Sequence, residues 1–388
     1  MFNRIPRFLL EINMTVSRRT LSAIGLAISA FASTGAMADT VSVPGLHSHK
    51  VFTSSNAAEG NELMVLAPSA TGELGVVAHT STGGLGLGKG LGSQGAVTLS
   101  GDGQYALVVN AGNNTVSVFT LGDDMLTLSA TVDSAGLTPI SVTEHEGQVY
   151  VLNSGGAGNV AGFMLADGQL TPVAGAVAPL SVASGAAPAQ VSFTADGKAL
   201  VVTEKGTNKL SSYHVHGDSS LKGPIVTNSP GQTPFGFAVS PSNVMVVSEA
   251  VGGAAGASTV SSYRFKDGSP AVPRVMSAAV PDTQSAACWV AITPSGKWAY
   301  VANTGSSSVS SYRIDQKGRI TLSAAVAGNT GSGTAPADLT VAADGQHLYV
   351  RNGGVPGIAN FVIGKGGVLS AGTSFTGLSA IATGLAAN

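Results

Sequence analysis

The stretch that decides the fold is ALVVTEKGTNKLSSY, residues Ala199–Tyr213. Its first hydrophobic run ends at a polar residue, Glu204, and after a short polar loop a second run ends at an aromatic residue. The same layout recurs along the chain, once in degenerate form, as Lys50–Val65, Tyr105–Phe119, Val149–Phe163, Val244–Tyr263, Ala299–Tyr312 and Leu348–Phe361. Such repetition indicates a repeat architecture.

The spacing of the repeats is nearly constant. Their last five terminal aromatic residues lie 50, 50, 49 and 49 residues apart: Phe163, Tyr213, Tyr263, Tyr312 and Phe361. An apolar run and an Asp-Gly or Ser-Gly turn of the hairpin type precede most copies. A second turn and a run rich in Thr, Ser, Ala and Val follow. Each repeat therefore predicts four short antiparallel strands, of which the first are Ala96–Leu99, Gln190–Phe193, Phe235–Val239, Trp289–Ile292 and Asp338–Val341.

Four antiparallel strands repeated radially make a β-propeller. Six complete repeats occupy the chain from about residue 95 to 376. Residues 50–85 supply strands two to four of a further repeat, and Leu378–Leu385 is typical of its missing first strand. We therefore predict an all-β fold in which residues 39–388 form one seven-bladed β-propeller, closed by a composite N- and C-terminal blade. A β-helix or an open sandwich is the alternative architecture.

The N-terminal segment, residues 1–38, has the pattern of an export signal. Arg18 and Arg19 precede a short apolar stretch, Leu21–Phe31, and small residues up to Ala38 fit a cleavage site. Met14 is a second candidate start. We expect an exported protein, periplasmic or secreted, by either the general route or the twin-arginine route, which the paired arginines resemble.

Composition argues against several classes of protein and of binding site. The net charge of -2 gives no basic footprint for nucleic acid. A single cysteine, Cys288, excludes an internal disulfide and is expected to be a buried small hydrophobe. After residue 38, Gly, Ser and charged residues interrupt every apolar run, so no membrane span is predicted. The seven histidines show no zinc-ligand spacing, and the Gly-rich runs do not open helices. We therefore predict no metal and no cofactor.

In a propeller the second strand ends near the start of the first, at one mouth of the channel. That register predicts a ring of side chains there: Asn56, Asn110, Asn153, Glu204, Glu249, Asn303 and Asn352. Asn is explained by turn formation, but a glutamate cannot make the donor contacts of an amide. Two carboxylates on adjacent blades suit acid–base chemistry or cation binding. Alternatively, each pairs with a lysine, such as Lys205 or Lys209, on a solvated rim.

The starts of the first strands contribute further candidates to that mouth. Gln190 is polar, and Trp289 is either a stacking surface for a ligand or packing between blades. Asp338 and Arg351 belong to one repeat and are expected to lie across from each other. We predict that these four residues, with Asn153 and Asn303, contact a small-molecule ligand.

Three stretches, Phe193–Tyr213, Pro234–Ala250 and Ala287–Tyr312, resemble the seven-bladed β-propeller lactonases, which include 6-phosphogluconolactonase and the carboxymuconate-lactonising enzyme. The resemblance implies lactone hydrolysis or formation at the channel mouth without a metal. It implies that Glu204 is the acid or base and that Lys209 contacts a substrate anion in place of an arginine. Where the family often carries a histidine, this chain has Pro188, Ala189 and Gln190.

The sequence thus predicts a lactonase-like hydrolase of a small sugar or acidic lactone. In this hypothesis Glu204 activates water and Glu249 assists or orients it. The alternative is a non-catalytic propeller that binds a ligand or a protein partner at the same mouth. Propellers host many unrelated functions, so the choice rests on the site rather than on the fold.

Overall fold

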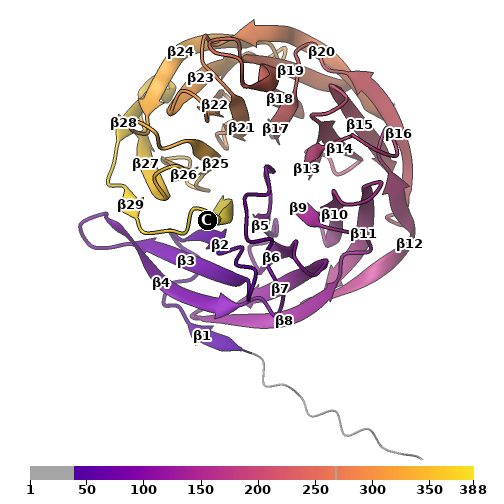
Figure 1. The fold of residues 1–388 in the computed structure, drawn as a ribbon, viewed down its shortest axis with the longest axis vertical. Coiled ribbons are helices and arrows are strands. Elements are labelled where there is room, and N and C mark those ends of the chain that lie inside the picture. The colour runs from indigo at the N-terminus through magenta and orange to yellow at the C-terminus, as the bar shows by residue number, and fades with distance from the viewer. Residues whose placement is uncertain (1–38, 267–268) are drawn as a thin grey trace, which may run out of the picture. The chain divides into compact units, whose positions relative to one another are not determined.

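The computed structural model describes residues 39–266 and 269–388; the predicted export signal lies outside them. Seven antiparallel sheets surround a central channel, and the described residues contain only two single turns of 3₁₀ helix, η1 (Val251–Gly253) and η2 (Lys365–Gly367) (Figure 1). The predicted seven-bladed β-propeller is therefore confirmed. No helix in the described part of the chain is long and apolar enough to cross a membrane.

The strands of each blade follow from the innermost to the outermost. Blade 1 contains β30 (Thr383–Ala387), β2 (Val51–Ser54), β3 (Glu62–Pro68) and β4 (Leu74–Ser81). Blade 2 contains β5 (Val97–Leu99), β6 (Tyr105–Asn110), β7 (Thr115–Leu121), β8 (Met125–Asp133) and β1 (Thr40–Ser42). Blade 3 contains β9 (Pro139–His145), β10 (Gln148–Asn153), β11 (Asn159–Ala166) and β12 (Gln169–Pro179).

The other four blades continue around the ring in chain order. Blade 4 contains β13 (Pro188–Phe193), β14 (Ala199–Glu204), β15 (Lys209–Val215) and β16 (Leu221–Asn228). Blade 5 contains β17 (Pro234–Val239), β18 (Val244–Glu249), β19 (Thr259–Lys266) and β20 (Ser269–Pro281). Blade 6 contains β21 (Ala287–Ile292), β22 (Trp298–Asn303), β23 (Ser308–Ile314) and β24 (Ile320–Asn329). Blade 7 contains β25 (Pro336–Val341), β26 (His347–Asn352), β27 (Gly357–Ile363) and β28 (Leu369–Ala371), and β29 (Phe375–Thr376) also pairs with β27.

The terminal aromatic residue of each repeat explains why the period is so regular. These side chains lie on the third strands and are buried in the core clusters of the ring, with exposures between 0% and 3%: Phe119, Phe163, Tyr213, Tyr263, Tyr312 and Phe361. Tyr213 also reaches the preceding blade, where its hydroxyl donates to the carbonyl of Pro179 at 2.8 Å. Burial of each ring contributes about 1.5–3 kcal/mol, so the spacing of these residues fixes the spacing of the blades.

The composite blade closes the ring as predicted, with one shift. β30 pairs with β2, with Val51 opposite Ala387. Leu378–Leu385 was the predicted strand, but Ala382 donates to the carbonyl of Ser379 in a turn, so the strand begins only at Thr383. The extra strand β1, which pairs with β8, has no counterpart in the repeat and was not predicted.

Candidate functional site

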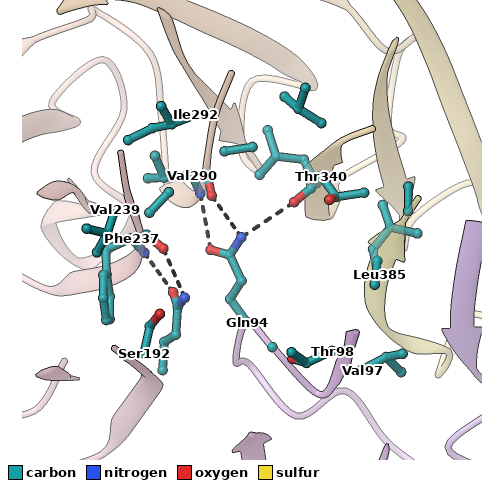
Figure 2. A pocket seen from close by; sticks show the side chains of 18 of the residues that line it. Gln94, Val97, Thr98, Ser192, Phe237, Val239, Val290, Ile292, Thr340 and Leu385 are labelled. Carbon is teal, nitrogen blue, oxygen red and sulfur yellow. Dashed lines mark hydrogen bonds between the residues drawn. The ribbon is translucent and has the colours of Figure 1, made fainter. Parts of the chain in front are cut away.

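A cavity of about 370 Å³ occupies the channel, and the innermost strands of the blades line it (Figure 2). Gln94, which precedes β5, closes the end of the cavity at which the innermost strands begin; we name this the Gln94 end. Its amide Nε2 donates to the carbonyl of Val290 at 2.9 Å, and its Oε1 accepts from the Val290 amide at 3.2 Å. The cavity lining contains no titratable side chain, so the cavity alone offers no acid or base.

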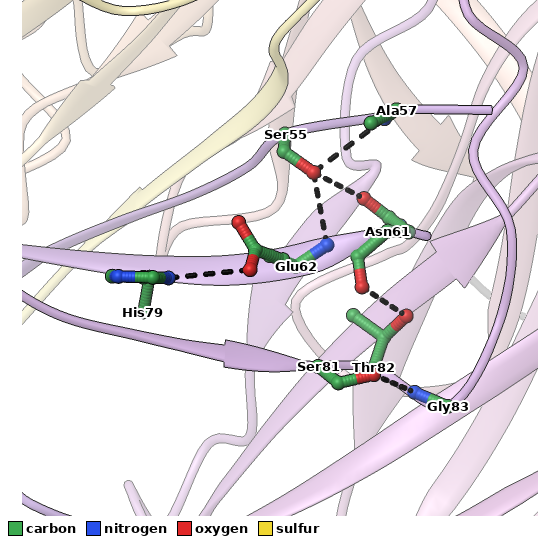
Figure 3. A network of polar contacts seen from close by, with 8 residues as sticks. All are labelled: Ser55, Ala57, Asn61, Glu62, His79, Ser81, Thr82 and Gly83. Carbon is green, nitrogen blue, oxygen red and sulfur yellow. Dashed lines mark hydrogen bonds and ion pairs between the residues drawn. The ribbon is translucent and has the colours of Figure 1, made fainter. Parts of the chain in front are cut away.

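Gln94 is carried by the Gly-rich loop, residues 82–96, which leaves blade 1 and crosses the Gln94 end. Its start is fixed by a polar network at the edge of blade 1, in which Thr82 Oγ1 donates to the carbonyl of Asn61 at 3.0 Å and Gly83 N donates to Ser81 Oγ at 3.1 Å (Figure 3). Further along, Leu87 N donates to Asn56 Oδ1 at 2.7 Å. The loop is thus held against the blades at several points.

Close packing explains why this loop is rich in glycine. A Cβ atom at Gly86 would lie 2.1 Å from the backbone carbon of Asn56, and one at Gly84 would lie 2.4 Å from the Asn110 amide. Real Cβ atoms do not approach other atoms so closely, so only glycine fits at these two positions. The absence of a helix in this Gly-rich run agrees with the sequence, and the loop it forms extends to the channel, where Gln94 bonds Val290.

Lys205 holds the far part of the Gly-rich loop. Its ammonium group donates to the carbonyl of Gly92 at 2.6 Å and lies 4.3 Å from the centre of the Phe235 ring. Phe235 in turn packs edge-on against Trp289, with ring centres 4.7 Å apart. Burial lowers the pKa of Lys205 to about 8, and the effect of Cys288 opposes this shift. A lysine whose pKa is lowered to about 8 therefore lies beside the Phe235 ring at the Gln94 end.

Cys288 itself is buried, as predicted. Burial raises the pKa of its thiol above the ordinary value, with Thr304 and Lys205 acting in the opposite direction. A buried thiol with a raised pKa is a poor nucleophile.

Asp338 and Arg351 lie directly opposite each other on β25 and β26, as the sequence predicted. Burial raises the pKa of Asp338 to about 7, which the nearby Arg351 charge and the Leu339 amide oppose. Burial also lowers the pKa of Arg351, and Asp338 opposes that shift. Arg351 Nη2 donates to the carbonyl of Ala337 at 2.9 Å, while Asp338 Oδ1 accepts from the Leu339 amide at 2.8 Å. The two side chains are coupled electrostatically but do not form a direct ion pair.

Three buried polar atoms at the starts of β21 and β25 and the end of β26 have no hydrogen-bond partner among the described residues: Trp289 Nε1, Asp338 Oδ2 and Arg351 Nε. Two are donors and one is an acceptor. Buried polar groups are nearly always paired, and these three are among eleven buried side-chain atoms of the described residues that have no partner, so a ligand or water could complete them. Together with Lys205 and Phe235, these residues form what we name the mouth cluster.

Glu204 and Glu249 have a different environment from the one predicted. Both are 0% exposed. Glu204 accepts hydrogen bonds from the amide and the hydroxyl of Ser181, from Thr207 Oγ1 at 2.9 Å and from Ser211 Oγ at 2.6 Å. A carboxylate has about four acceptor sites, so Glu204 has none left for a substrate. The alternative interpretation, pairing with a lysine on a solvated rim, is wrong, because neither carboxylate forms an ion pair with a lysine among the described residues.

Glu249 repeats this arrangement in blade 5. It accepts from Ser229 Oγ and Gly231 N, each at 3.0 Å, and from the hydroxyls of Thr259 and Ser261. In both blades the carboxylate therefore ties the incoming loop from the previous blade to the third strand. The geometry gives the two glutamates a structural role, and their predicted catalytic role remains a prediction.

The other predicted ligand contacts are divided between the channel and the blades. Gln190 lines the cavity and bonds the backbone of Phe237, accepting from its amide at 2.7 Å. Asn153 and Asn303 are buried within their blades, where Asn303 Nδ2 donates to Ser308 and Ser310 and Asn153 Nδ2 donates to the Ser134 carbonyl. Lys209 lies opposite Glu204 on β15 and is half-buried.

The mouth cluster was only partly found from the sequence. Trp289, Asp338 and Arg351 were predicted there, but Lys205 was considered only as a rim partner of the glutamates. The sequence does contain a signal for Lys205. In blades 4 to 7 the residue directly after the second strand is Lys205, Ala250, Thr304 or Gly353, and of these four only Lys205 is charged. Among the described residues, no group of three or more His, Cys, Asp or Glu side chains could hold a metal ion.

Comparisons with known proteins agree with this architecture. The model of the family described as Lactonase, 7-bladed beta-propeller matches residues 254–376. A Bacteroides fragilis protein proposed to be a 6-phosphogluconolactonase superposes with a TM-score of 0.68 at 19% identity, covering 87% of this chain and 98% of that one. The Pseudomonas aeruginosa periplasmic gluconolactonase superposes with a TM-score of 0.65 at 18% identity, with the same coverage of each chain. No curated protein matches the sequence.

At such identities a structural likeness establishes the fold alone, since one fold hosts many functions. The Kuenenia stuttgartiensis hydrazine synthase illustrates this, because it superposes on 80% of this chain and 94% of its own with a TM-score of 0.55 at 16% identity. The family match carries the sequence evidence and confirms the predicted resemblance. The chain is a seven-bladed β-propeller that is similar in sequence to the family described as Lactonase, 7-bladed beta-propeller over residues 254–376, and similar in fold to solved propellers.

Proposed function

We propose that this protein hydrolyses a small sugar lactone or acidic lactone at the mouth cluster. The observation that carries the proposal is Asp338, a buried carboxyl group with a pKa of about 7 and one oxygen without a partner. A general base works best when its pKa lies near the operating pH. The family match over residues 254–376, which includes Trp289, Asp338 and Arg351, supports a lactone as the substrate class.

In the proposed reaction, Asp338 Oδ2 accepts a proton as a water molecule attacks the carbonyl carbon of the lactone. The negative charge that develops on the carbonyl oxygen is stabilised by the free donors Trp289 Nε1 and Arg351 Nε. Cleavage of the ring C–O bond then returns the proton from Asp338 to the leaving alkoxide, which gives a hydroxy acid. The steps use side chains alone, in line with the predicted metal-independent hydrolysis.

Lys205 has the position and charge to bind an acidic group of the substrate. It contacts both the Gly-rich loop and the Phe235 ring, and it is cationic below a pH of about 8. Because Asp338 is only 1% exposed, substrate reaches it when the Gly-rich loop shifts away from the Gln94 end. Closure of the loop would then exclude bulk water, which strengthens the electrostatic contacts of the mouth cluster.

The test is a panel of sugar and acidic lactones incubated with the purified protein, with acid release followed by pH-stat titration. We expect hydrolysis of at least one lactone and a loss of about 10²–10⁴-fold in rate for Asp338→Asn, as is typical when a general base is removed. Asp344→Asn, in the same blade but in the turn after β25, is the matched control. Absence of acid release from every lactone, with ligand binding at the Gln94 end retained, would favour the non-catalytic binding propeller instead.

We also propose that the protein is exported, on the basis of the signal pattern in residues 1–38. Mass spectrometry of protein recovered from the periplasm or medium should give a mature N-terminus at Asp39. Replacement of Arg18 and Arg19 by lysine should block export only if the twin-arginine route is used. Recovery of the uncleaved chain from the cytoplasm alone would contradict the proposal.

A further inference from the structure

A second pocket, of about 830 Å³, lies on blade 6 away from the channel. Its walls come from the start of β22, the end of β23, the turn that follows β23, and Gly366 of η2. The side chains that define it are Lys297, Trp298, Arg313, Lys317 and Arg319. None of these residues lines the central cavity. A pocket of this size is within the range that holds small ligands.

The charge of this pocket is unusual for the chain. Only 19 of 388 residues are Lys or Arg, yet four of them line this one pocket. The single carboxylate in the lining is Asp315. Among the described residues, none of the four cations takes part in an ion pair, and all four are exposed. The pocket therefore presents a concentrated positive charge that the protein itself leaves unpaired.

Asp315 orders the turn that carries two of these cations. Its Oδ1 accepts from the amides of Lys317 and Arg319, each at 2.8 Å, and Gly318 N donates to the Asp315 carbonyl at 3.0 Å. These contacts fix the backbone from which both side chains project. The charge of Asp315 interacts with those of Lys317 and Arg319 but forms no ion pair with either, so all four cations of the pocket remain available to a ligand.

Trp298 supplies an aromatic surface beside the cations. It lies directly opposite Arg313 in the β22–β23 pair and is half-buried. A Cβ atom at Gly367 would lie 2.2 Å from Trp298 Cδ2, so only glycine permits the backbone to approach the ring this closely. The carbonyl of Gly367 accepts from the Tyr300 hydroxyl at 2.9 Å, which holds that backbone in place. The indole is thus supported rigidly from one side.

We propose that this pocket binds an anionic saccharide. The apolar face of a sugar ring packs on an indole, while carboxylate, phosphate or sulfate groups on the sugar pair with guanidinium and ammonium groups. The four cations stand on one strand and two turns beside Trp298, an arrangement that suits several anionic groups on one ligand rather than a single small ion. The net charge of the whole chain, -2, argues against a nucleic acid as the occupant.

Isothermal titration calorimetry with trigalacturonate tests the proposal, with maltotriose as a neutral sugar of the same length and inorganic phosphate as the anion alone. We expect trigalacturonate to bind, to weaken as NaCl is raised, and to bind more tightly than either comparison ligand. The double variant Arg313→Gln, Arg319→Gln should weaken binding at least about tenfold, since it removes two charge-assisted contacts. Both side chains are exposed, so this variant is expected to fold normally.

The matched control is Lys198→Gln, Lys222→Gln, which removes two positive charges from blade 4 and should leave binding unchanged. Trp298→Leu should abolish the preference for trigalacturonate over phosphate. The proposal is overturned if maltotriose binds equally well, if the Arg313, Arg319 variant binds normally, if a short oligonucleotide outcompetes the saccharide, or if trigalacturonate does not bind. Asp338→Asn should bind trigalacturonate normally, so the outcome is independent of the proposed hydrolysis.

Discussion

At the residue scale, Asp338 is almost completely buried and its pKa lies at about 7. The pKa of Lys205 is about one unit higher, at about 8. If Asp338 acts as the base and Lys205 as the cation that binds substrate, the first must be deprotonated and the second protonated. We therefore expect a bell-shaped pH profile of kcat/KM, with limbs near pH 7 and pH 8. Steady-state rates on any hydrolysed lactone between pH 5 and 10 would show it. Retention of the acid limb in Asp338→Asn would contradict the assignment.

The same carboxyl group should make stability depend on pH. Its folded pKa of about 7 lies above the value of about 3.9 for an unfolded aspartate, so the folded state binds more protons between these values. Its contribution to the free energy of unfolding is therefore full below about pH 4 and is lost as pH rises through 7. The loss is on the order of 4 kcal/mol, from a shift of about three pKa units at about 1.4 kcal/mol per unit.

Urea denaturation at pH 5, 6 and 7 measures this dependence. The wild-type free energy of unfolding should fall across the range relative to that of Asp338→Asn, while Asp344→Asn should follow the wild type. Parallel curves for the wild type and Asp338→Asn would show that the carboxyl group titrates normally.

For the buried Glu204 we predict an effect on stability rather than on turnover. Glu204→Gln places an NH₂ group where the carboxylate accepts from the Ser181 amide and three hydroxyls. We expect a loss of about 1–3 kcal/mol in the free energy of unfolding, as for a buried group left without its partner, and unchanged turnover per folded molecule. The exposed Glu59→Gln is the control. Loss of turnover with unchanged stability would instead support the catalytic role of Glu204 that is predicted from the sequence.

At the scale of elements, the Gly-rich loop is attached by side chains at both of its ends. Gln94→Leu keeps the side-chain size but removes the bonds to Val290, so the end of the loop over the channel should be released. We expect faster trypsin cleavage after Lys89, an exposed residue of that loop. Gln190→Leu removes equivalent backbone bonds from a strand and should not accelerate this cleavage. Equal cleavage rates in the two variants would contradict the proposed attachment.

The Gly-rich loop also shows which part of the fold could not be predicted from the sequence. The strands were predicted because Asp-Gly turns and buried aromatic residues such as Tyr213 act locally and repeat. The path of the Gly-rich loop was not, because it depends on Gln94 bonding a backbone 196 residues away. Likewise, the hydrogen bonds of Glu204 with Ser181 and Ser211 were not predicted, because the fold brings these hydroxyls together from different strands and loops.

At the scale of the whole molecule, the ring depends on blade 1. Deletion of residues 383–388 removes β30 and leaves β2 with an unpaired inner edge, and such edges invite aggregation. We expect a lower melting temperature and higher oligomers in size-exclusion chromatography with light scattering. Deletion of residues 39–42 removes only the supplementary strand β1 and is the control. A truncated chain that melts like the full chain would contradict closure through β30.

The pairing of Val51 with Ala387 also sets an order of events during protein synthesis. In blades 2 to 7 the four strands of the repeat are consecutive, so each blade can form as it leaves the ribosome, with β1 as an addition to blade 2. Blade 1 cannot, because the strand that completes it is made 336 residues after the residue it pairs with. Contacts between distant residues form late, since the intervening chain must first be ordered. Every nascent molecule therefore passes through an open ring with β2 exposed until β30, the strand that completes the propeller, has been translated.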